Sequence, residues 1–215
     1  MPRFIFSTLF IVGMLLVVSS CSRPAENTSE KRNAFLEEVR SSVKKERQKS
    51  QGFAQVIKDE IILSLQGPKI AATAQAELLK NVGKAMKVGG PVNAVDFCNV
   101  HASSIIDSLS DALKATISRV SDKSRNPNNA ASEEEKAIMA FFAQHKQVKD
   151  TLVGDTYYKP IVLGMPTCLK CHGKAVSEID KPTFIIINER YPNDLAKDYA
   201  LGDMRGLWKI SLSSD

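Results

Sequence analysis

One run of five residues, Cys168-Leu169-Lys170-Cys171-His172, constrains this chain more than any other part of its sequence. Covalent attachment of a c-type haem requires this spacing, because each thiol can form a thioether with one haem vinyl group and the adjacent imidazole can reach the iron. The chain has only 4 cysteines and 3 histidines in 215 residues, so chance placement explains the motif poorly. We therefore expect one covalent haem c, held by Cys168 and Cys171, with His172 as the fifth ligand of the iron.

The composition is that of an ordinary globular protein. Hydrophobic residues make up 43% and charged residues 25% of the 215 residues, which is enough apolar material for one substantial core. The formal net charge is +5, but basic and acidic residues alternate along most of the chain. This alternation is typical of a solvated surface, and we expect no nucleic-acid partner.

The first 20 residues resemble an export signal. Arg3 precedes an apolar run over residues 4–18, and Val18-Ser19-Ser20-Cys21 follows. The run is too short and too early for a membrane span, and its ending resembles a bacterial lipobox, in which the chain is cut before the cysteine and that cysteine is acylated. We expect Cys21 to carry lipid and to anchor the protein at a periplasm-facing membrane of the cell envelope. An ordinary cleaved signal peptide is the alternative.

The residues after the lipid site predict a tether and then one domain. Ser22 favours transfer of the lipoprotein to an outer membrane, and the polar residues 21–32 are expected to form a flexible tether before a single domain at 33–215. Export leads to an oxidising compartment, where cysteines usually pair. Because the other three cysteines are assigned to lipid and haem, Cys98 is left without a partner.

Apolar spacing predicts three helices in the first half of the domain. Their expected ranges are 33–65 with a bend at Gly52 and a stop at Gly67-Pro68, about 70–86 with a stop at Gly89-Gly90-Pro91, and 92–113. On the third helix Cys98 lies in the middle of the apolar face and His101 at its edge, one turn later. Either side chain could be aimed at an iron. Equally, Cys98 could be a small core residue and His101 a solvated one.

The second half of the domain is predicted to consist of short strands with one inserted helix. The strand candidates are 116–121, 156–163, 184–187 and 207–212, and a capping-box sequence predicts a helix that starts at Ser132. Several short strands with one inserted helix predict an antiparallel α+β fold, with the long N-terminal helices packed alongside.

Further blocks surround the cysteine motif in a fixed order. They are Cys98 with Ala102; Arg119-Val120-Ser121 followed by Arg125-Asn126-Pro127-Asn128-Asn129; Tyr158-Lys159-Pro160-Ile161; Cys168-Leu169-Lys170-Cys171-His172-Gly173; and Tyr191-Pro192-Asn193-Asp194 through Gly202-Asp203-Met204-Arg205-Gly206. In this order they resemble the bacterial c-type haem proteins that have a PAS-like domain and His/Cys axial ligation, and the similarity covers about residues 33–213. The family often has Pro at position 103 and Gly at position 198, where this chain has Ser103 and Asp198. Neither is a ligand position, so the changes bear on loop geometry.

The resemblance implies a fold and a ligand set. The fold is a PAS-like antiparallel sheet beside long helices, with haem c between the helix and sheet regions. Cys168 and Cys171 hold the haem, His172 is the proximal ligand and Cys98 the distal one. The other candidates for the distal position are His101, His145, Met86, Met139, Met165 and Met204. Arg119, Arg125, Arg190 and Arg205 lie in or beside the blocks, and each could pair with a haem propionate or form an ordinary salt bridge.

Two occupied axial positions imply one-electron chemistry rather than turnover of a substrate. An anionic sulfur ligand stabilises ferric iron, which implies a low reduction potential. We therefore expect electron transfer, or redox or gas sensing, through an unknown redox or signalling protein, and not an enzyme.

Two alternatives from other classes remain open. Cys98, His101, Cys168 and Cys171 could form a structural zinc site in a binding module. Cys168 and Cys171 could instead be the active pair of a periplasmic thiol oxidoreductase, although no thioredoxin-like pattern surrounds them.

Overall fold

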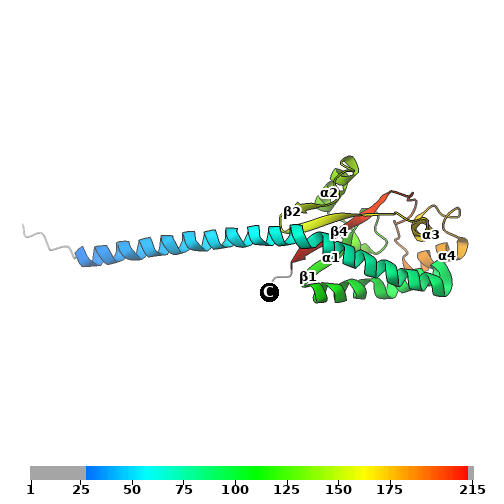
Figure 1. Cartoon of the computed structure of the whole chain (residues 1–215), viewed down its shortest axis with the longest axis horizontal. Helices are drawn as coiled ribbons and strands as arrows, with labels where there is room; N and C mark the ends of the chain where they lie inside the picture. Colours follow the sequence, from blue (N-terminus) through cyan, green and yellow to red (C-terminus); the bar gives the residue numbers. More distant parts are fainter. Residues whose placement is uncertain (1–27, 213–215) are drawn as a thin grey trace, which may run out of the picture. The chain divides into compact units, whose positions relative to one another are not determined.

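The computed structural model describes residues 28–212, so the expected signal sequence and Cys21 lie outside the described part of the chain. The chain divides into two compact units, residues 1–49 and 50–215. The elements are labelled in Figure 1. They are α1 (Thr28–Leu113), β1 (Ala115–Val120), η1 (Pro127–Asn129), α2 (Glu133–Gln144), β2 (Thr151–Val153), β3 (Thr156–Val162), η2 (Pro166–Cys168), α3 (Leu169–His172), α4 (Lys181–Arg190) and β4 (Met204–Leu212).

The described part of the first unit is a solvated helix. Residues 28–49 belong to α1, and the side chains of 29–49 are exposed. The helix therefore includes residues 28–32, which the sequence analysis assigned to the tether. One ion pair on this segment joins Arg40 Nη1 to Glu37 Oε1 at 2.6 Å, one helical turn apart. Such exposed pairs stabilise a helix only by a few tenths of a kcal/mol.

In the second unit α1 forms two arms that meet at a pair of glycines. Gly89 and Gly90 are the positions of non-helical backbone, and Gly90 has a φ of 68°, which glycine adopts readily. Across the break, Asn93 Nδ2 donates to the carbonyl oxygen of Ala85 at 2.9 Å. Figure 1 shows the second arm, in green, running back beside the first. The predicted end at Gly89-Gly90 and the predicted third helix are confirmed.

Two other expectations for α1 are wrong. The sequence predicts a bend at Gly52 and a stop at Gly67-Pro68, yet the backbone is helical at these positions. Leu63 and Ile70, on either side of Pro68, are both buried in the core that faces the sheet. Burying two such side chains contributes roughly 3–6 kcal/mol, against a cost of about 3 kcal/mol for a proline inside a helix. Packing therefore carries the helix through the proline.

The four strands form one antiparallel sheet in the order β1-β4-β3-β2. Antiparallel pairing places Ile117 of β1 and Tyr157 of β3 opposite Ile210 of β4. The α+β prediction is confirmed, as are the strand candidates that became β1, β3 and β4. The three-residue β2 was not predicted, because a single short hairpin arm carries little pattern.

The strand candidate 184–187 is wrong, because this segment is the middle of helix α4. Asp180 caps the helix by accepting a hydrogen bond from the backbone N–H of Thr183 at 2.8 Å, and Pro182 occupies the first turn. Both features are helix-start signals that outweigh the β-branched run.

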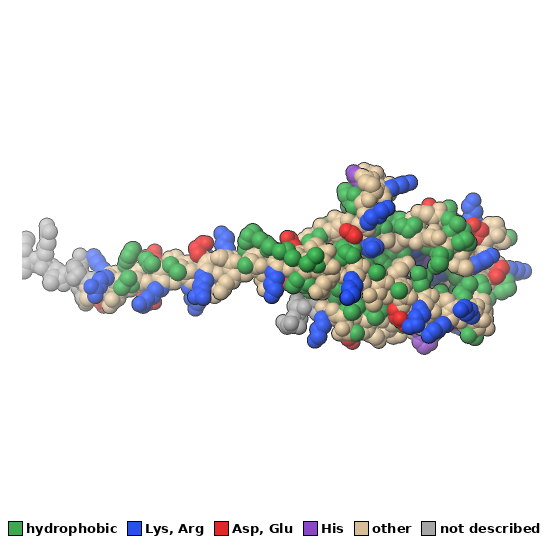
Figure 2. Space-filling model, in the orientation of Figure 1, with side chains coloured by type: hydrophobic (Ala, Val, Ile, Leu, Met, Phe, Trp, Pro, Cys, Tyr) green, Lys and Arg blue, Asp and Glu red, His purple; other side chains and the backbone are tan. Residues whose placement is uncertain are grey.

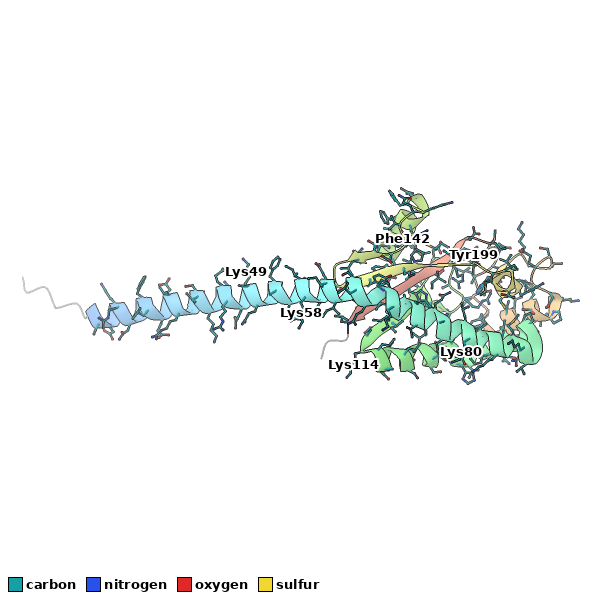
Figure 3. The ribbon with its side chains drawn as sticks, viewed as in Figure 1. Lys49, Lys58, Lys80, Lys114, Phe142 and Tyr199 are labelled. Carbon is teal, nitrogen blue, oxygen red and sulfur yellow. The ribbon has the colours of Figure 1, made fainter. Side chains whose placement is uncertain are left out.

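Helices cover both faces of the sheet. On one face the arms of α1 bury Leu63, Ile70 and Ile106 against Trp208 and Ile210, and the indole N–H of Trp208 donates to Gln75 Oε1 at 2.8 Å. On the other face α2 packs against the sheet through a second cluster, which consists of Val120, Ile138, Met139, Phe142, Tyr158 and Leu207. Phe142 is labelled in Figure 3. The predicted capping box of α2, formed by Ser132 and Glu135, is present.

Within residues 28–212 no helix has the combined length and apolar content that crossing a membrane requires.

Two glycines in the first arm of α1 have different surroundings, so we expect their replacement by alanine to change the free energy of unfolding in opposite directions. A Cβ at Gly67 would lie 2.5 Å from Cγ of Tyr157, whereas a Cβ at Gly83 would meet no heavy atom within 4 Å. Gly67→Ala is therefore expected to lower the free energy of unfolding by about 1–3 kcal/mol through overpacking. Gly83→Ala is expected to raise it by about 0.5–1 kcal/mol, because alanine favours the helix. Chemical denaturation of both variants measures the difference, and equal stabilities would contradict the packing of Tyr157 on α1.

Candidate cofactor site

The cysteine motif forms two short consecutive helical turns. η2 ends at Cys168 and α3 covers Leu169–His172, so both thiols and the imidazole come from adjacent turns. The next residue must be small: a Cβ at Gly173 would lie 2.7 Å from the carbonyl oxygen of Leu169 and 2.6 Å from Glu178 Oε2. The glycine therefore lets the chain leave this turn closely packed against the segment that follows.

His172 is oriented by the backbone of a distant loop. Its Nδ1 lies 3.0 Å from the carbonyl oxygen of Ala196, and because a carbonyl can only accept, Nδ1 carries the proton and Nε2 has the free lone pair. Burial and the nearby charges of Arg125 and Arg205 hold the pKa of His172 well below its ordinary value. The ring is therefore neutral at neutral pH, and Nε2 is available as a metal ligand.

The third thiol reaches the motif from α1. Cys98 lies on the second arm, and it interacts electrostatically with Cys171 and with Arg119. Near it, Val95 packs in a cluster that Cys171 joins. Cys98, Cys168 and Cys171 are all free thiols in the described structure. The fold thus brings Cys98 to the motif that contains Cys168, Cys171 and His172.

The half-buried thiols of Cys98 and Cys171 are not activated. Burial raises the pKa of Cys171 to about 11, against the opposing effect of Arg125. Burial also raises the pKa of Cys98, and here Arg119 and Arg125 act in the opposite direction. Both thiols are therefore protonated at neutral pH in the cofactor-free chain.

Three of the four candidate arginines surround this group of side chains. Arg119 and Arg205 come from the neighbouring strands β1 and β4, and Arg125 follows β1; all three act on the pKa of His172. Arg190 instead makes a half-exposed ion pair, with its Nε 2.6 Å from Asp96 Oδ1. We call Cys98, Cys168, Cys171 and His172 with Arg119, Arg125 and Arg205 the thiol–arginine cluster.

Arg125 is fixed by several partners at once. Its Nε and Nη2 donate to the carboxylate of Asp194 at 3.1 and 3.2 Å, and its Nη2 also donates to the carbonyl oxygens of Cys171 and Ala196 at 2.6 and 3.3 Å. The Asp194 side chain is fully buried. This guanidinium ties the motif to the loop whose carbonyl orients His172.

The other histidines lie away from the cluster. His101 is exposed and lies beside the ring of Phe97, with 5.2 Å between ring centroids. His145 is exposed at the end of α2, with its Nδ1 2.9 Å from the carbonyl oxygen of Phe141. Met139 is buried on the α2 side of the sheet. Within the described range no group of three or more His, Cys, Asp and Glu side chains is placed to hold a metal ion, so the zinc set with His101 gains no support.

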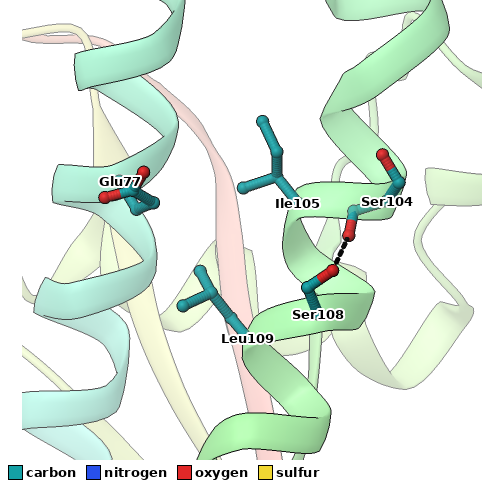
Figure 4. Close-up of a pocket in the computed structure, with 5 residues that line it drawn as sticks. All are labelled: Glu77, Ser104, Ile105, Ser108 and Leu109. Atoms are coloured by element: carbon teal, nitrogen blue, oxygen red, sulfur yellow. Dashed lines mark hydrogen bonds between the residues drawn. The ribbon is translucent and has the colours of Figure 1, made fainter.

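One surface cavity lies away from the cysteine motif. It has a volume of about 350 Å³ between the two arms of α1, and Figure 4 shows Glu77 on one arm facing Ile105 and Leu109 on the other. A second cavity of about 200 Å³ has Arg125 and Tyr191 in its lining. Neither contains a cysteine of the cluster. The chemistry of the side chains, rather than the size of a cavity, therefore marks the candidate site.

The sequence and the fold relate this chain to one known family. The sequence model of the Tll0287-like family, described as Tll0287, matches residues 22–213. The chain belongs to the Tll0287-like family. A solved structure of a relative, the cyanobacterial heme-protein Tll0287, superimposes with a TM-score of 0.52 and 21% sequence identity, covering 68% of this chain and 94% of that chain. At this identity the likeness shows a shared fold. No curated protein matches the chain.

Two residues of the site lay in the family blocks but were given no role by the sequence. Asp194 anchors Arg125, and Tyr199 places its ring edge-on to His172 at 6.4 Å between centroids. The hydroxyl oxygen of Tyr199, labelled in Figure 3, is buried and has no hydrogen-bond partner among the described residues. Asp194 and Tyr199 come close to the motif only in the folded chain. No local sequence pattern predicts such long-range contacts.

Proposed function

We propose that this protein binds one haem c covalently, through thioethers from Cys168 and Cys171 and through Nε2 of His172. One observation carries the proposal: the motif presents two unbonded thiols and a neutral imidazole whose Nδ1–H is already bonded to Ala196. An imidazole that ligates iron usually donates its other N–H to a carbonyl or carboxylate, which fixes the ring. The solved relative with the same fold, Tll0287, is a cyanobacterial heme-protein.

The surrounding residues fit such a group. Cys168 and Leu169 pack with the buried cluster of Leu163, Ala196 and Tyr199, which supplies apolar surface beside the motif. Figure 2 shows hydrophobic side chains gathered at the end of the second unit that carries α3 and α4, with lysines and arginines around them. When bound, a haem supplies one-electron redox chemistry. The chain's own residues orient the imidazole, supply thiols and limit access of water.

We further propose that Cys98 is the sixth ligand. Its support is position: it approaches the motif from α1 and interacts electrostatically with Cys171, whereas His101 is exposed. A thiol that coordinates a metal ion loses its proton, so the raised pKa of the free Cys98 thiol does not prevent it from binding iron. If Cys98 and His172 both held the iron of a bound haem, the thiolate would keep its reduction potential low and no ligand position would be vacant. Low-potential electron transfer, or redox or gas sensing through a partner protein on a PAS-like scaffold, is the function this supports.

A thiol oxidoreductase is the weaker alternative. Such enzymes attack through a thiolate whose pKa is lowered. Here burial raises the pKa of Cys171 to about 11. That environment suits a thiol consumed once in attachment rather than one that must ionise in every cycle.

Mass spectrometry of the denatured protein tests the haem proposal. Protein produced together with haem-attachment machinery is expected to keep one haem after denaturation, and Cys168→Ala with Cys171→Ala should abolish this adduct, because thioethers survive unfolding while axial ligands do not. The His101→Ala variant is the control and should keep the adduct. An unmodified wild-type mass would contradict the proposal.

The same proposal places the protein on a membrane of the cell envelope through lipid at Cys21. Cys21→Ala is expected to leave the protein unlipidated and to release it from the membrane fraction or to block its processing, because one or more acyl chains supply the binding energy. Ser22→Ala is the matched control and should stay in the membrane fraction. Fractionation together with a fatty-acid label gives the answer, and continued labelling of the Cys21 variant would contradict lipidation at this residue.

A further inference from the structure

The thiol–arginine cluster carries more positive charge than the described protein compensates. Arg119, Arg125 and Arg205 lie close enough for each to act on His172, and Lys123 lies 4.3 Å from the ring centroid of Tyr199 in the same region. The buried carboxylate beside them is Asp194, which is already bonded to Arg125. Removing several cations from water is costly unless an anion pairs with them.

Arg119 has no polar partner of its own. Among residues 28–212 its guanidinium makes no hydrogen bond and no ion pair, and it lies 5.9 Å from the ring centroid of Trp208. Burial lowers the pKa of Arg119, and the groups that act against this are Cys98 and Tyr191, neither a carboxylate. A guanidinium has five N–H donors, and because Arg119 is only half-buried, these donors are open to an acceptor that the described residues do not supply.

Arg205 is in a similar position on the neighbouring strand. Its Nη1 donates to Ser121 Oγ at 2.7 Å, and its guanidinium carbon lies 5.6 Å from the ring centroid of Tyr199. It makes no ion pair with a described carboxylate. The Tyr199 hydroxyl nearby is itself buried without a partner. Arg205 therefore has one neutral acceptor and no carboxylate, and the Tyr199 hydroxyl beside it has no acceptor.

Arg119 and Arg205 reach the vicinity of His172 from two adjacent strands. Arg119 on β1 pairs with Trp208 on β4, and β4 continues from there back to Arg205 near its start. The two guanidiniums thus belong to adjacent strands and share the vicinity of His172. Arg125 and Arg190 differ from them, because each already has its own carboxylate, Asp194 or Asp96.

We infer that Arg119 and Arg205, with the hydroxyl of Tyr199, form a carboxylate-binding site for the two propionates of the haem that the proposed function places on this motif. Carboxylates supply the missing acceptors and neutralise the two unpaired guanidiniums. Arg125 has a different task, which is to anchor the backbone around His172. Of the four candidate arginines, Arg119 and Arg205 are thus assigned to the cofactor. Arg125 stabilises the fold through Asp194, and Arg190 forms a surface ion pair with Asp96.

Resonance Raman spectra and redox titration of the haem-loaded full chain test this assignment. Arg119→Gln and Arg205→Gln are each expected to shift the propionate-bending bands and to lower the reduction potential, because a cation near the iron is lost. Arg190→Gln is the matched control and should change neither. A lower potential with unchanged propionate bands would overturn the assignment, because the arginine would then act only through its charge. Unchanged bands and potential would overturn it too.

Some variants will not attach haem covalently, and for these a second experiment measures porphyrin binding. It uses the full chain produced without haem-attachment machinery. Zinc protoporphyrin IX and its dimethyl ester differ only in their two carboxylates. Arg119→Gln with Arg205→Gln is expected to weaken the diacid by on the order of 10-fold to 100-fold and to leave the diester almost unchanged. Equal weakening of both would overturn the inference and indicate a structural role. Failure of the wild-type chain to bind either porphyrin would contradict the proposed function itself, so the two failures are distinguishable.

Discussion

Haem-loaded protein in which Cys98 is replaced by alanine is expected to have a reduction potential higher by on the order of 100 mV, because axial ligands set haem potentials over a span of about 0.8 V and the anionic ligand that stabilises ferric iron is lost. The same change should convert a low-spin ferric spectrum into a high-spin one, or into that of a replacement ligand. Cys98 is the thiol that α1 brings to the motif, and it interacts with both Cys171 and Arg119. Electron paramagnetic resonance and a redox titration measure the two effects.

His101 provides the control for this experiment, since it lies one turn from Cys98 on the same arm of α1. It is exposed and lies beside Phe97. The His101→Ala variant should therefore keep the wild-type spectrum and potential. A low-spin signature that persists without Cys98 and disappears without His101 would show that the histidine is the ligand and would overturn the proposed His/Cys pair.

Asp194→Ala is expected to destabilise the fold by about 3–5 kcal/mol, the usual cost of leaving one partner of a buried ion pair without the other. The carboxylate holds Arg125 through two hydrogen bonds and also accepts from the backbone N–H of Ala196 at 2.8 Å. Its side chain is fully buried, and that of Arg125 is 11% exposed. Because the carbonyl of Ala196 orients His172, the variant should also disturb the haem spectrum. Chemical denaturation gives the stability change.

Asp96→Ala is the matched control, because it removes the carboxylate from another arginine pair at the surface. The side chains of Arg190 and Asp96 are 48% and 40% exposed, so this variant should lose no more than about 1 kcal/mol. If both aspartate variants lost the same small amount, the pair of Arg125 and Asp194 would not be the anchor described here.

Local signals in the sequence predicted local structure well. The capping box at Ser132, the glycine pair at 89–90 and the alternation of β1 each determine the backbone through neighbours in the chain, and each prediction was confirmed. Of the wrong predictions for these elements, one was decided by tertiary packing and the other by a helix cap that precedes the apolar run. Pro68 continues the helix because the sheet buries the residues around it, and 184–187 is helical because of a cap that precedes it.

The same division applies to the candidate site. The motif with Cys168, Cys171 and His172 is local, and its spacing was readable. Which arginine has a carboxylate and which has none depends on strands and loops that meet only in the fold. The sequence could therefore list four candidate arginines but could not distinguish Arg119 and Arg205 from Arg125 and Arg190. Tyr199 was missed for the same reason, because it and His172 are far apart in the sequence and come into contact only in the fold.

The separation of Cys98 from the motif bears on the order of maturation. Two thiols and a histidine within five residues can react with a haem while the chain is still unfolded, because a contact of such short sequence separation costs little loop-closure entropy. Cys98 reaches the motif only after the arms of α1 have packed on a sheet in which β4, an interior strand, is the last of the described elements. On the proposed ligation, the change of the iron from five to six ligands would follow attachment and report the completion of folding. Stopped-flow spectroscopy could then follow the assembly of this domain through its own chromophore.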